Sequence, residues 1–155
     1  MGFSIEDGTP ALCDAVARKV AGLPLLTRYG MTGEWLAQSL ESALERPGES
    51  VIVACEAVKP VGFAWFLPRG TFATGGYLRL IAVAPACQSR GVGAELLAEV
   101  ERRVADHSRT LFLLVSDFNT AAQRFYAAHG YRQGGRLEAF VKADIDELIY
   151  WKRIG

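Results

Sequence analysis

The stretch from Ile81 to Ala94 joins an apolar segment to a short glycine-containing loop and then to the start of an amphipathic segment. The residues before the loop predict a buried strand. After the loop, apolar residues recur at helical spacing between charged ones, which predicts a helix with one core-facing side. Those apolar residues are Leu96, Leu97, Val100 and Val104. The stretch therefore predicts a strand, a tight loop and a helix in direct succession.

The loop between the strand and the helix is suited to binding phosphate. Gly91 and Gly93 carry no side chains at the point where the helix begins, so backbone N–H groups can approach an anion closely. The positive end of the helix dipole favours negative charge at the same place. Arg90 adds a cation of the kind that grips phosphate oxygens. An ordinary strand-to-helix turn is the alternative interpretation.

The spacing of the glycines shows which type of phosphate-binding loop this segment resembles. A P-loop ends in Gly-Lys-Ser/Thr, which this chain lacks. A dinucleotide fingerprint needs Gly or Ala three positions after the second glycine, where this chain has Leu96. The pattern Gln/Arg-x-x-Gly-x-Gly/Ala fits residues Gln88 to Gly93. It resembles the pyrophosphate loop of the GNAT superfamily, the N-acetyltransferases that use acetyl-CoA.

A second segment carries the same resemblance. Leu111–Ser116 is a continuous apolar run that predicts a buried strand, and Asn119 is a suitable cap for a helix over Thr120–His129. Gly130 is a typical C-terminal cap of such a helix. The Asn, the aromatic-Tyr pair and the final Gly-aromatic pair are similar to the second cofactor segment of GNAT proteins. The pairs here are Phe125-Tyr126 and Gly130-Tyr131. We interpret Phe125 as a core residue and Tyr126 as the residue at the family's general-acid position.

The remaining elements follow from periodicity and from Gly and Pro punctuation. Their order, β-α-α-β-β-β-α-β-α-β-β, is similar to that of the GNAT fold over nearly the whole chain. The resemblance implies an α/β fold, a three-layer α/β/α (α+β) sandwich with a mixed, mostly antiparallel sheet and splayed central parallel strands, in a single domain over residues 1–155. The expected strands are Phe3–Glu6, Ser50–Ala57, Val61–Leu67, Tyr77–Val83, Leu111–Ser116, Tyr131–Leu137 and Asp146–Arg153; the helices are Thr9–Ala21, Gly33–Glu45, a helix after Gly93, and Thr120–His129; loops are expected at Gly22–Thr32 and Arg69–Gly75.

Composition narrows the class of protein. The 155 residues include 17 basic and 17 acidic side chains, so no excess charge favours nucleic acid or an anionic membrane. No apolar run reaches the roughly 20 residues of a membrane span, and the first residues do not form a signal peptide. Cys13, Cys55 and Cys87 are widely spaced, which indicates neither a disulfide framework nor a zinc site. We expect a cytoplasmic protein without a metal.

The resemblance implies a role for each part of the two motifs. Acetyl-CoA would be the cosubstrate, with its pantetheine arm in the gap between the two splayed strands. The backbone of Ile81, Ala82 and Val83 would bind that arm, and a free N–H there would stabilise the oxyanion of the tetrahedral intermediate. Asn119 would hydrogen-bond the arm, and Tyr126 would protonate the departing CoA thiolate or donate a hydrogen bond to it. The pyrophosphate would be bound by Ser89, Arg90, Gly91, Val92, Gly93 and Ala94.

Several assignments stay open at this level. No Glu stands at the positions where many relatives carry the general base, which leaves Asp117, Glu138, Glu147 or a chain of waters. Leu26–Tyr29 and Arg69–Phe72 are expected to border the acceptor site, and Trp35, Trp65 and Phe66 are further candidates for its lining. The acceptor is expected to be an amine on a small molecule or a protein. The alternatives are a non-catalytic acetyl-CoA-binding domain or transfer of another acyl group, and a homodimer is left open.

Overall fold

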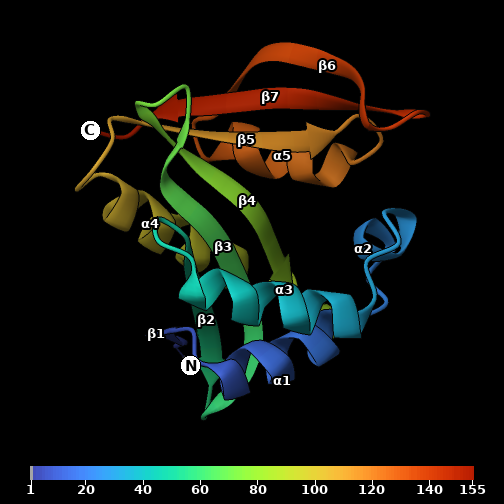
Figure 1. Ribbon diagram of the computed structural model, residues 1–155, viewed down its shortest axis with the longest axis vertical. Helices are drawn as coiled ribbons and strands as arrows, with labels where there is room; N and C mark the ends of the chain where they lie inside the picture. Colours follow the sequence, from blue (N-terminus) through green and yellow to red (C-terminus); the bar gives the residue numbers. More distant parts are fainter. Residues whose placement is uncertain (1) are drawn as a thin grey trace.

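The computed structural model describes residues 2–155 and is built around one seven-stranded sheet (Figure 1). The strands lie in the order β1-β2-β3-β4-β5-β7-β6, and every neighbouring pair is antiparallel except β4–β5. The strands are β1 (Ser4–Asp7), β2 (Ser50–Glu56), β3 (Lys59–Thr71), β4 (Gly75–Val83), β5 (Thr110–Ser116), β6 (Arg132–Lys142) and β7 (Ile145–Arg153). The helices are α1 (Pro10–Val20), α2 (Pro24–Arg28), α3 (Gly33–Glu45), α4 (Val92–Val104) and α5 (Thr120–Ala128), with a 3-10 turn at Pro85–Cys87. The mixed, mostly antiparallel sheet confirms the predicted fold class.

The sheet separates two apolar layers. On one face, α1 and α3 pack over β2, β3 and β4, and their buried residues join Val51, Val53 and Phe63. On the other face, α4 packs against β2–β5, and its buried residues join Ile52, Phe66 and neighbours from β5 and β7. Neighbouring residues of β2 therefore face opposite layers, as the period of two in a strand requires. The α1–α3 layer ends near the middle of the sheet, whereas the other layer continues to β5, β7 and α5 (Figure 1).

Local sequence explains where the longer helices begin. The hydroxyl of Thr9 accepts a hydrogen bond from the N–H of Leu12, and Thr32 does the same for Trp35. Pro10 occupies the first turn of α1, where its missing N–H costs nothing. The four apolar residues predicted for the helix after the loop are all buried on α4.

Three segments differ from the predictions. The expected loop at Gly22–Thr32 contains a short helix, α2, because Pro24 can start a helix and Leu26 is buried against the α1–α3 layer. The expected loop at Arg69–Gly75 is shorter, since β3 continues to Thr71. β6 also extends past Leu137 to Lys142 and closes a tight hairpin with β7 at Ile145. In each case pairing or burial supplied by distant residues overrides weak local signals.

β4 diverges from β5 soon after the two strands meet. Their parallel pairing covers only Gly76–Leu78 opposite Leu111–Leu113. Beyond that point Trp65 pairs with Leu80 and Phe66 with Leu78, so β4 carries one extra residue, a bulge at Arg79. A bulge bends and twists its strand. The splay that the family resemblance implied is therefore present and begins at this bulge.

Among residues 2–155, no helix has the length and apolar character needed to cross a membrane.

Candidate active site

The splay opens a large cavity beside the end of β4. Its volume is about 680 Å³, and it runs from α2 to the start of α5. Past Leu78 the inner edge of β4 pairs with no strand of residues 2–155, so backbone groups of Ile81–Val83 face the gap. An extended ligand with amide groups can pair with such an edge as a strand does. The predicted residues in the wall are Ile81, Ala82, Val83, Ser89, Gly93, Asn119 and Tyr126.

The loop after β4, where the pyrophosphate is predicted to bind, lines part of this cavity. Ser89 and Gly91 both have left-handed backbone conformations, with φ of 62° and 87°. Such turns direct successive N–H groups into one concavity, which is an anion-binding arrangement. The first N–H groups of α4 have no partners within the helix and point the same way. A second hollow of about 410 Å³ lies against Ser89, Gly91, Gly93 and Ala94.

Two residues of the predicted pyrophosphate loop point elsewhere. The guanidinium of Arg90 forms an ion pair with Glu56 at 2.5 Å and lies over the ring of Phe3. The side chain of Val92 is buried in the α4 layer, so only its backbone can face a ligand. If the loop binds pyrophosphate, its backbone N–H groups would be the main donors, and Arg90 could contribute a direct contact only by exchanging its ion pair.

Asn119 lies at the join of β5 and α5, on the cavity wall. Its side-chain oxygen accepts a hydrogen bond from the N–H of Ala122 at 3.1 Å, which confirms the predicted helix cap. Its side-chain amide donates no hydrogen bond within residues 2–155, so it is available as a donor. The side-chain amide of Gln123 donates hydrogen bonds to the carbonyls of Ser116 and Asp117. These bonds and the Asn119 cap hold the end of β5 against α5.

Tyr126 lies on α5 and forms part of the wall of this cavity. Its side chain is only 6% exposed, and its ring packs edge-on against Phe125 and Tyr131. Burial raises the pKa of Tyr126 well above its ordinary value. The hydroxyl therefore keeps its proton, and it is better suited to donate a hydrogen bond to a thiolate than to transfer the proton outright.

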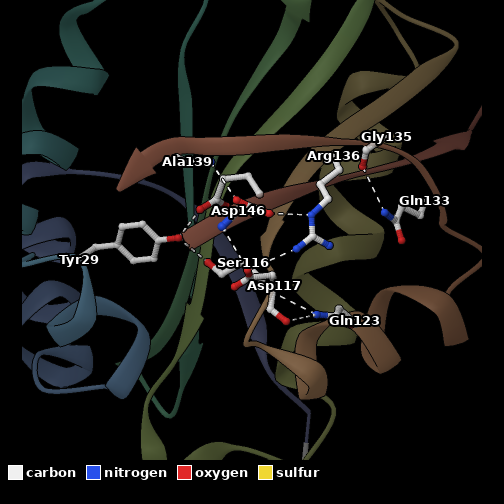
Figure 2. Close-up of polar contacts among 10 residues, drawn as sticks. Tyr29, Ser116, Asp117, Gln123, Gln133, Gly135, Arg136, Ala139 and Asp146 are labelled. Carbon is white, nitrogen blue, oxygen red and sulfur yellow. Dashed lines mark hydrogen bonds and ion pairs between the residues drawn. The ribbon is translucent and has the colours of Figure 1, made fainter. Parts of the chain in front are cut away.

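A second group of polar side chains lies at the end of β5. The hydroxyl of Tyr29, just after α2, lies 2.6 Å from Ser116 Oγ at the end of β5 and donates a hydrogen bond to Glu147 Oε2 on β7. Figure 2 shows the Tyr29 side chain reaching toward Ser116. Burial raises the pKa of Tyr29 to about 12, so this phenol stays a donor. Three segments far apart in sequence thus meet at one buried carboxylate.

The structure separates the three acidic residues named as candidate bases. Glu138 is exposed on β6. Asp117 pairs with Arg136, which also binds Asp146, so both carboxylates are neutralised at the edge shown in Figure 2. Glu147 is only 5% exposed, and desolvation raises its pKa despite the hydrogen bond from Tyr29. A carboxylate with a raised pKa is a better proton acceptor than a solvated one.

The expected acceptor-side residues divide into two groups. Leu26 and Tyr29 border the cavity or the Glu147 cluster, and Gly70, Thr71 and Phe72 line a separate apolar hollow. Trp65 and Phe66 are core residues and do not reach either cavity, and Trp35 lies partly exposed on α3. The sequence could not rank Tyr29 and Glu147 above other polar residues, because their meeting depends on α2 folding over the ends of β5 and β7.

Comparisons with known proteins agree with this geometry. Residues 23–131 match the model of the acetyltransferase (GNAT) family. An uncharacterised N-acetyltransferase of Bacillus subtilis, YjcF, is 34% identical over 110 residues, covering 70% of this chain and 73% of that one. A GNAT-family acetyltransferase of Desulfovibrio desulfuricans superposes with a TM-score of 0.84 at 26% identity, covering 99% of this chain and all of the other. An aminoglycoside 6'-N-acetyltransferase complexed with coenzyme A superposes at 0.79 with 22% identity, covering 100% and 98% of the two chains.

Proposed function

The chain belongs to the acetyltransferase (GNAT) family and is an N-acetyltransferase, and on that basis we propose that it moves the acetyl group of acetyl-CoA to a primary amine by direct attack. The observation that carries this proposal is the unpaired edge of β4 beside a loop of free N–H groups. The cavity extends along the edge of β4 to the loop that follows it. A structural relative with coenzyme A bound has the same fold, which supports the same cosubstrate here.

The proposed residue roles follow the cavity wall. The pyrophosphate binds the N–H groups from Ser89 to Ala94, including those of Val92 and Gly93, with Arg90 and Gly91 shaping the loop. The pantetheine arm pairs with Ile81–Val83 and with the amide of Asn119. Holding acetyl-CoA and the amine in one cleft replaces a chance encounter with a positioned one. A non-catalytic acetyl-CoA-binding domain remains the second candidate, and it predicts cofactor binding without CoA release.

Gly91 provides the direct test of the cofactor site. A Cβ built on Gly91 meets no atom of residues 2–155 within 4 Å, so a Gly91→Val side chain would project into the space left for phosphate. The variant also incurs left-handed strain, of the order of 1–2 kcal/mol. Gly48→Val is the matched control, because Gly48 has φ +84°, equally open surroundings and a place in the α3–β2 turn.

We expect calorimetric titration to show acetyl-CoA affinity reduced at least about 100-fold in Gly91→Val, because displaced phosphate contacts are charge-assisted, and unchanged in Gly48→Val. Equal affinities in the two folded variants would remove the loop from the cofactor site. CoA release measured with a panel of primary amines then separates the enzyme from the non-catalytic alternative.

A further inference from the structure

One face of the β5–β7 pair is mostly apolar, and no helix covers it except where the end of α2 brings Tyr29 to Ser116 and Glu147. Phe112, Leu114 and Ser116 of β5 pair with Trp151, Ile149 and Glu147 of β7, and paired residues share a face of a sheet. The alternate residues of these strands, including Leu111, Leu113 and Leu148, pack into the layer under α4 and α5. On the open side, α1 and α3 stop over β2–β4 (Figure 1).

A hollow of about 310 Å³ lies on this open face. Its wall is almost entirely apolar and comes from β4, β5, β6 and β7. Two aromatic side chains stand at its rim, Phe72 with 78% and Phe140 with 61% of the side chain exposed. The residues of the wall are Tyr77, Phe112, Leu113, Leu114, Leu137 and Ile149, with Gly70 and Thr71 beside Phe72. The hollow is large enough to hold an aromatic or short aliphatic group.

Glu147 lies directly beside this hollow. Leu137 is its register partner on β6, and Ile149 is its nearest neighbour on the same face of β7. Tyr77 on β4 is close enough for the Glu147 charge to influence its pKa. The single hydrogen bond that Glu147 accepts within residues 2–155 goes to Oε2, from Tyr29. Among residues 2–155 no side-chain oxygen is fully buried without a hydrogen-bond partner, so Oε1, which accepts no hydrogen bond there, retains some accessible surface.

The charges around Glu147 leave it without a cation. Asp117 and Asp146 share Arg136, and Arg28 and Arg79 lie over the rings of Phe118 and Trp65. Within residues 2–155, Glu147 forms no ion pair. A buried carboxylate without a cation is costly to keep, and a site of this kind is completed by a positively charged ligand.

We propose that the acceptor is a monocationic primary amine with an apolar substituent, whose ammonium binds Glu147 and whose substituent lies in the hollow beside Leu114, Leu137 and Ile149. This proposal rests on the proposed acetyl transfer and names its acceptor class and its base. A polycationic acceptor would need several unpaired carboxylates in the cleft, whereas the neighbouring Asp117 and Asp146 are already paired.

The proton transfers balance as follows. The bound ammonium gives one proton to the Glu147 carboxylate, and the lone pair so freed forms the N–C bond to the thioester carbonyl. The C–S bond then breaks, and its electron pair goes to sulfur as CoA thiolate. The nitrogen loses its second proton to become an amide, and the sulfur gains one from solvent with Tyr126 as hydrogen-bond donor. Glu147 returns its proton to water, and the products are the acetylated amine, CoA and one released proton.

The test compares Glu147→Gln with the exposed Glu45→Gln as matched control. The probes are 2-phenylethylamine and hexylamine, with spermidine and kanamycin as polycationic competitors. We expect Glu147→Gln to lower kcat/KM for 2-phenylethylamine about 100- to 1,000-fold, in the range of losing a positioned base, and Glu45→Gln to leave it unchanged. Acetyl-CoA affinity should stay the same in both variants, which also shows that both are folded.

The pH profile provides a readout that a purely structural role would not produce. The groups facing Glu147 are Tyr29 from the α2 end, Tyr77 from β4 and Asp117 directly after β5, the last held by Arg136. The acidic limb of kcat/KM in the wild type should disappear in Glu147→Gln. Phe140→Ser, at the exposed rim, should raise KM for 2-phenylethylamine several-fold with kcat nearly unchanged.

The outcomes distinguish this proposal from the proposed function. If amines are acetylated at rates that do not depend on Glu147, or spermidine and kanamycin are preferred, the proposal is wrong while acetyl transfer stands. If no amine is acetylated, calorimetry of 2-phenylethylamine binding in the presence of CoA tests whether the amine site exists. Binding that is lost in Glu147→Gln supports the site without the reaction, and equal binding or none overturns the site.

Discussion

Tyr126 offers the sharpest test at the scale of single residues. Its buried hydroxyl keeps its proton, so Tyr126→Phe removes one hydrogen-bond donor and almost no volume. We expect kcat to fall about 10- to 1,000-fold, as when one positioned acid or oxyanion donor is lost. Acetyl-CoA affinity, measured by calorimetry, should not change.

Tyr131→Phe is the matched control for Tyr126. The Tyr131 hydroxyl donates to Glu101 at 2.8 Å, outside the cleft, so this variant should lose stability while keeping kcat. Turnover by Tyr126→Phe at the wild-type rate would leave Tyr126 as a packing residue.

Glu147 links function to stability through its titration. Burial raises the pKa of its carboxyl in the folded state, so the folded protein holds this proton at pH values where the unfolded chain has released it. Stability from this group therefore falls as pH rises from the ordinary carboxyl pKa through the raised one. Gln does not titrate. The Tm of Glu147→Gln relative to wild type should thus shift upward between about pH 4 and pH 8.

Thermal unfolding of both proteins at the two pH values measures this shift, with Glu45→Gln expected to give none. A relative Tm that moved downward over the same interval would mean that Glu147 is stabilised as a carboxylate in the folded protein. The presence of a carboxylate at this buried position would then be explained by its contacts in the folded protein, without a cationic ligand.

At the scale of elements, the start of β4 packs closely against α4. A Cβ on Gly76 would lie 2.4 Å from Val104 Cγ1, a distance that the packing cannot accommodate without a shift. Gly76→Ala should therefore lower the free energy of unfolding by about 1–3 kcal/mol, the usual cost of overpacking. Chemical denaturation provides the measurement.

Val104→Ala supplies the partner for a double-mutant cycle. Removing the Val104 methyl groups makes room for the new Cβ, so the double variant should be less destabilised than the sum of the two single variants. Strict additivity of the two changes in the free energy of unfolding would show that the Gly76 and Val104 positions are not energetically coupled. The close approach of β4 to α4 would then not explain the cost of Gly76→Ala.

At the scale of the whole molecule, the sheet is continuous except between β4 and β5. Beyond Leu78 these two strands are not paired, and acetyl-CoA is proposed to bind in the gap between them. Amide exchange in peptides covering residues 79–94 should slow markedly when acetyl-CoA binds, because edge N–H groups gain partners. β2, which is paired on both sides, should change little. Exchange that slowed in β2 and not in residues 79–94 would contradict the proposed position of the ligand.

Local sequence determined the parts of this protein whose signals lie close together in the chain. Thr32 caps α3, so the helix begins at Gly33 as predicted, and Asn119 caps α5. The glycine spacing after β4 predicted a tight turn at the start of a helix, which the left-handed Ser89 and Gly91 and the start of α4 confirm, while anion binding there stays a prediction. These features are short-range, and a single sequence contains all the information they need.

Only the tertiary structure decided which polar groups meet. α2 forms because Leu26 is buried against distant helices, and its end brings Tyr29 to Ser116 and Glu147, residues 87 and 118 positions later. Arg90, which local sequence directed at phosphate, is held instead by Glu56 on β2. Ion pairs, the bulge at Arg79 and the burial of Glu147 depend on strand register and layer packing. Strand register and layer packing depend on many weak contacts between distant segments, so they cannot be predicted from a local sequence pattern.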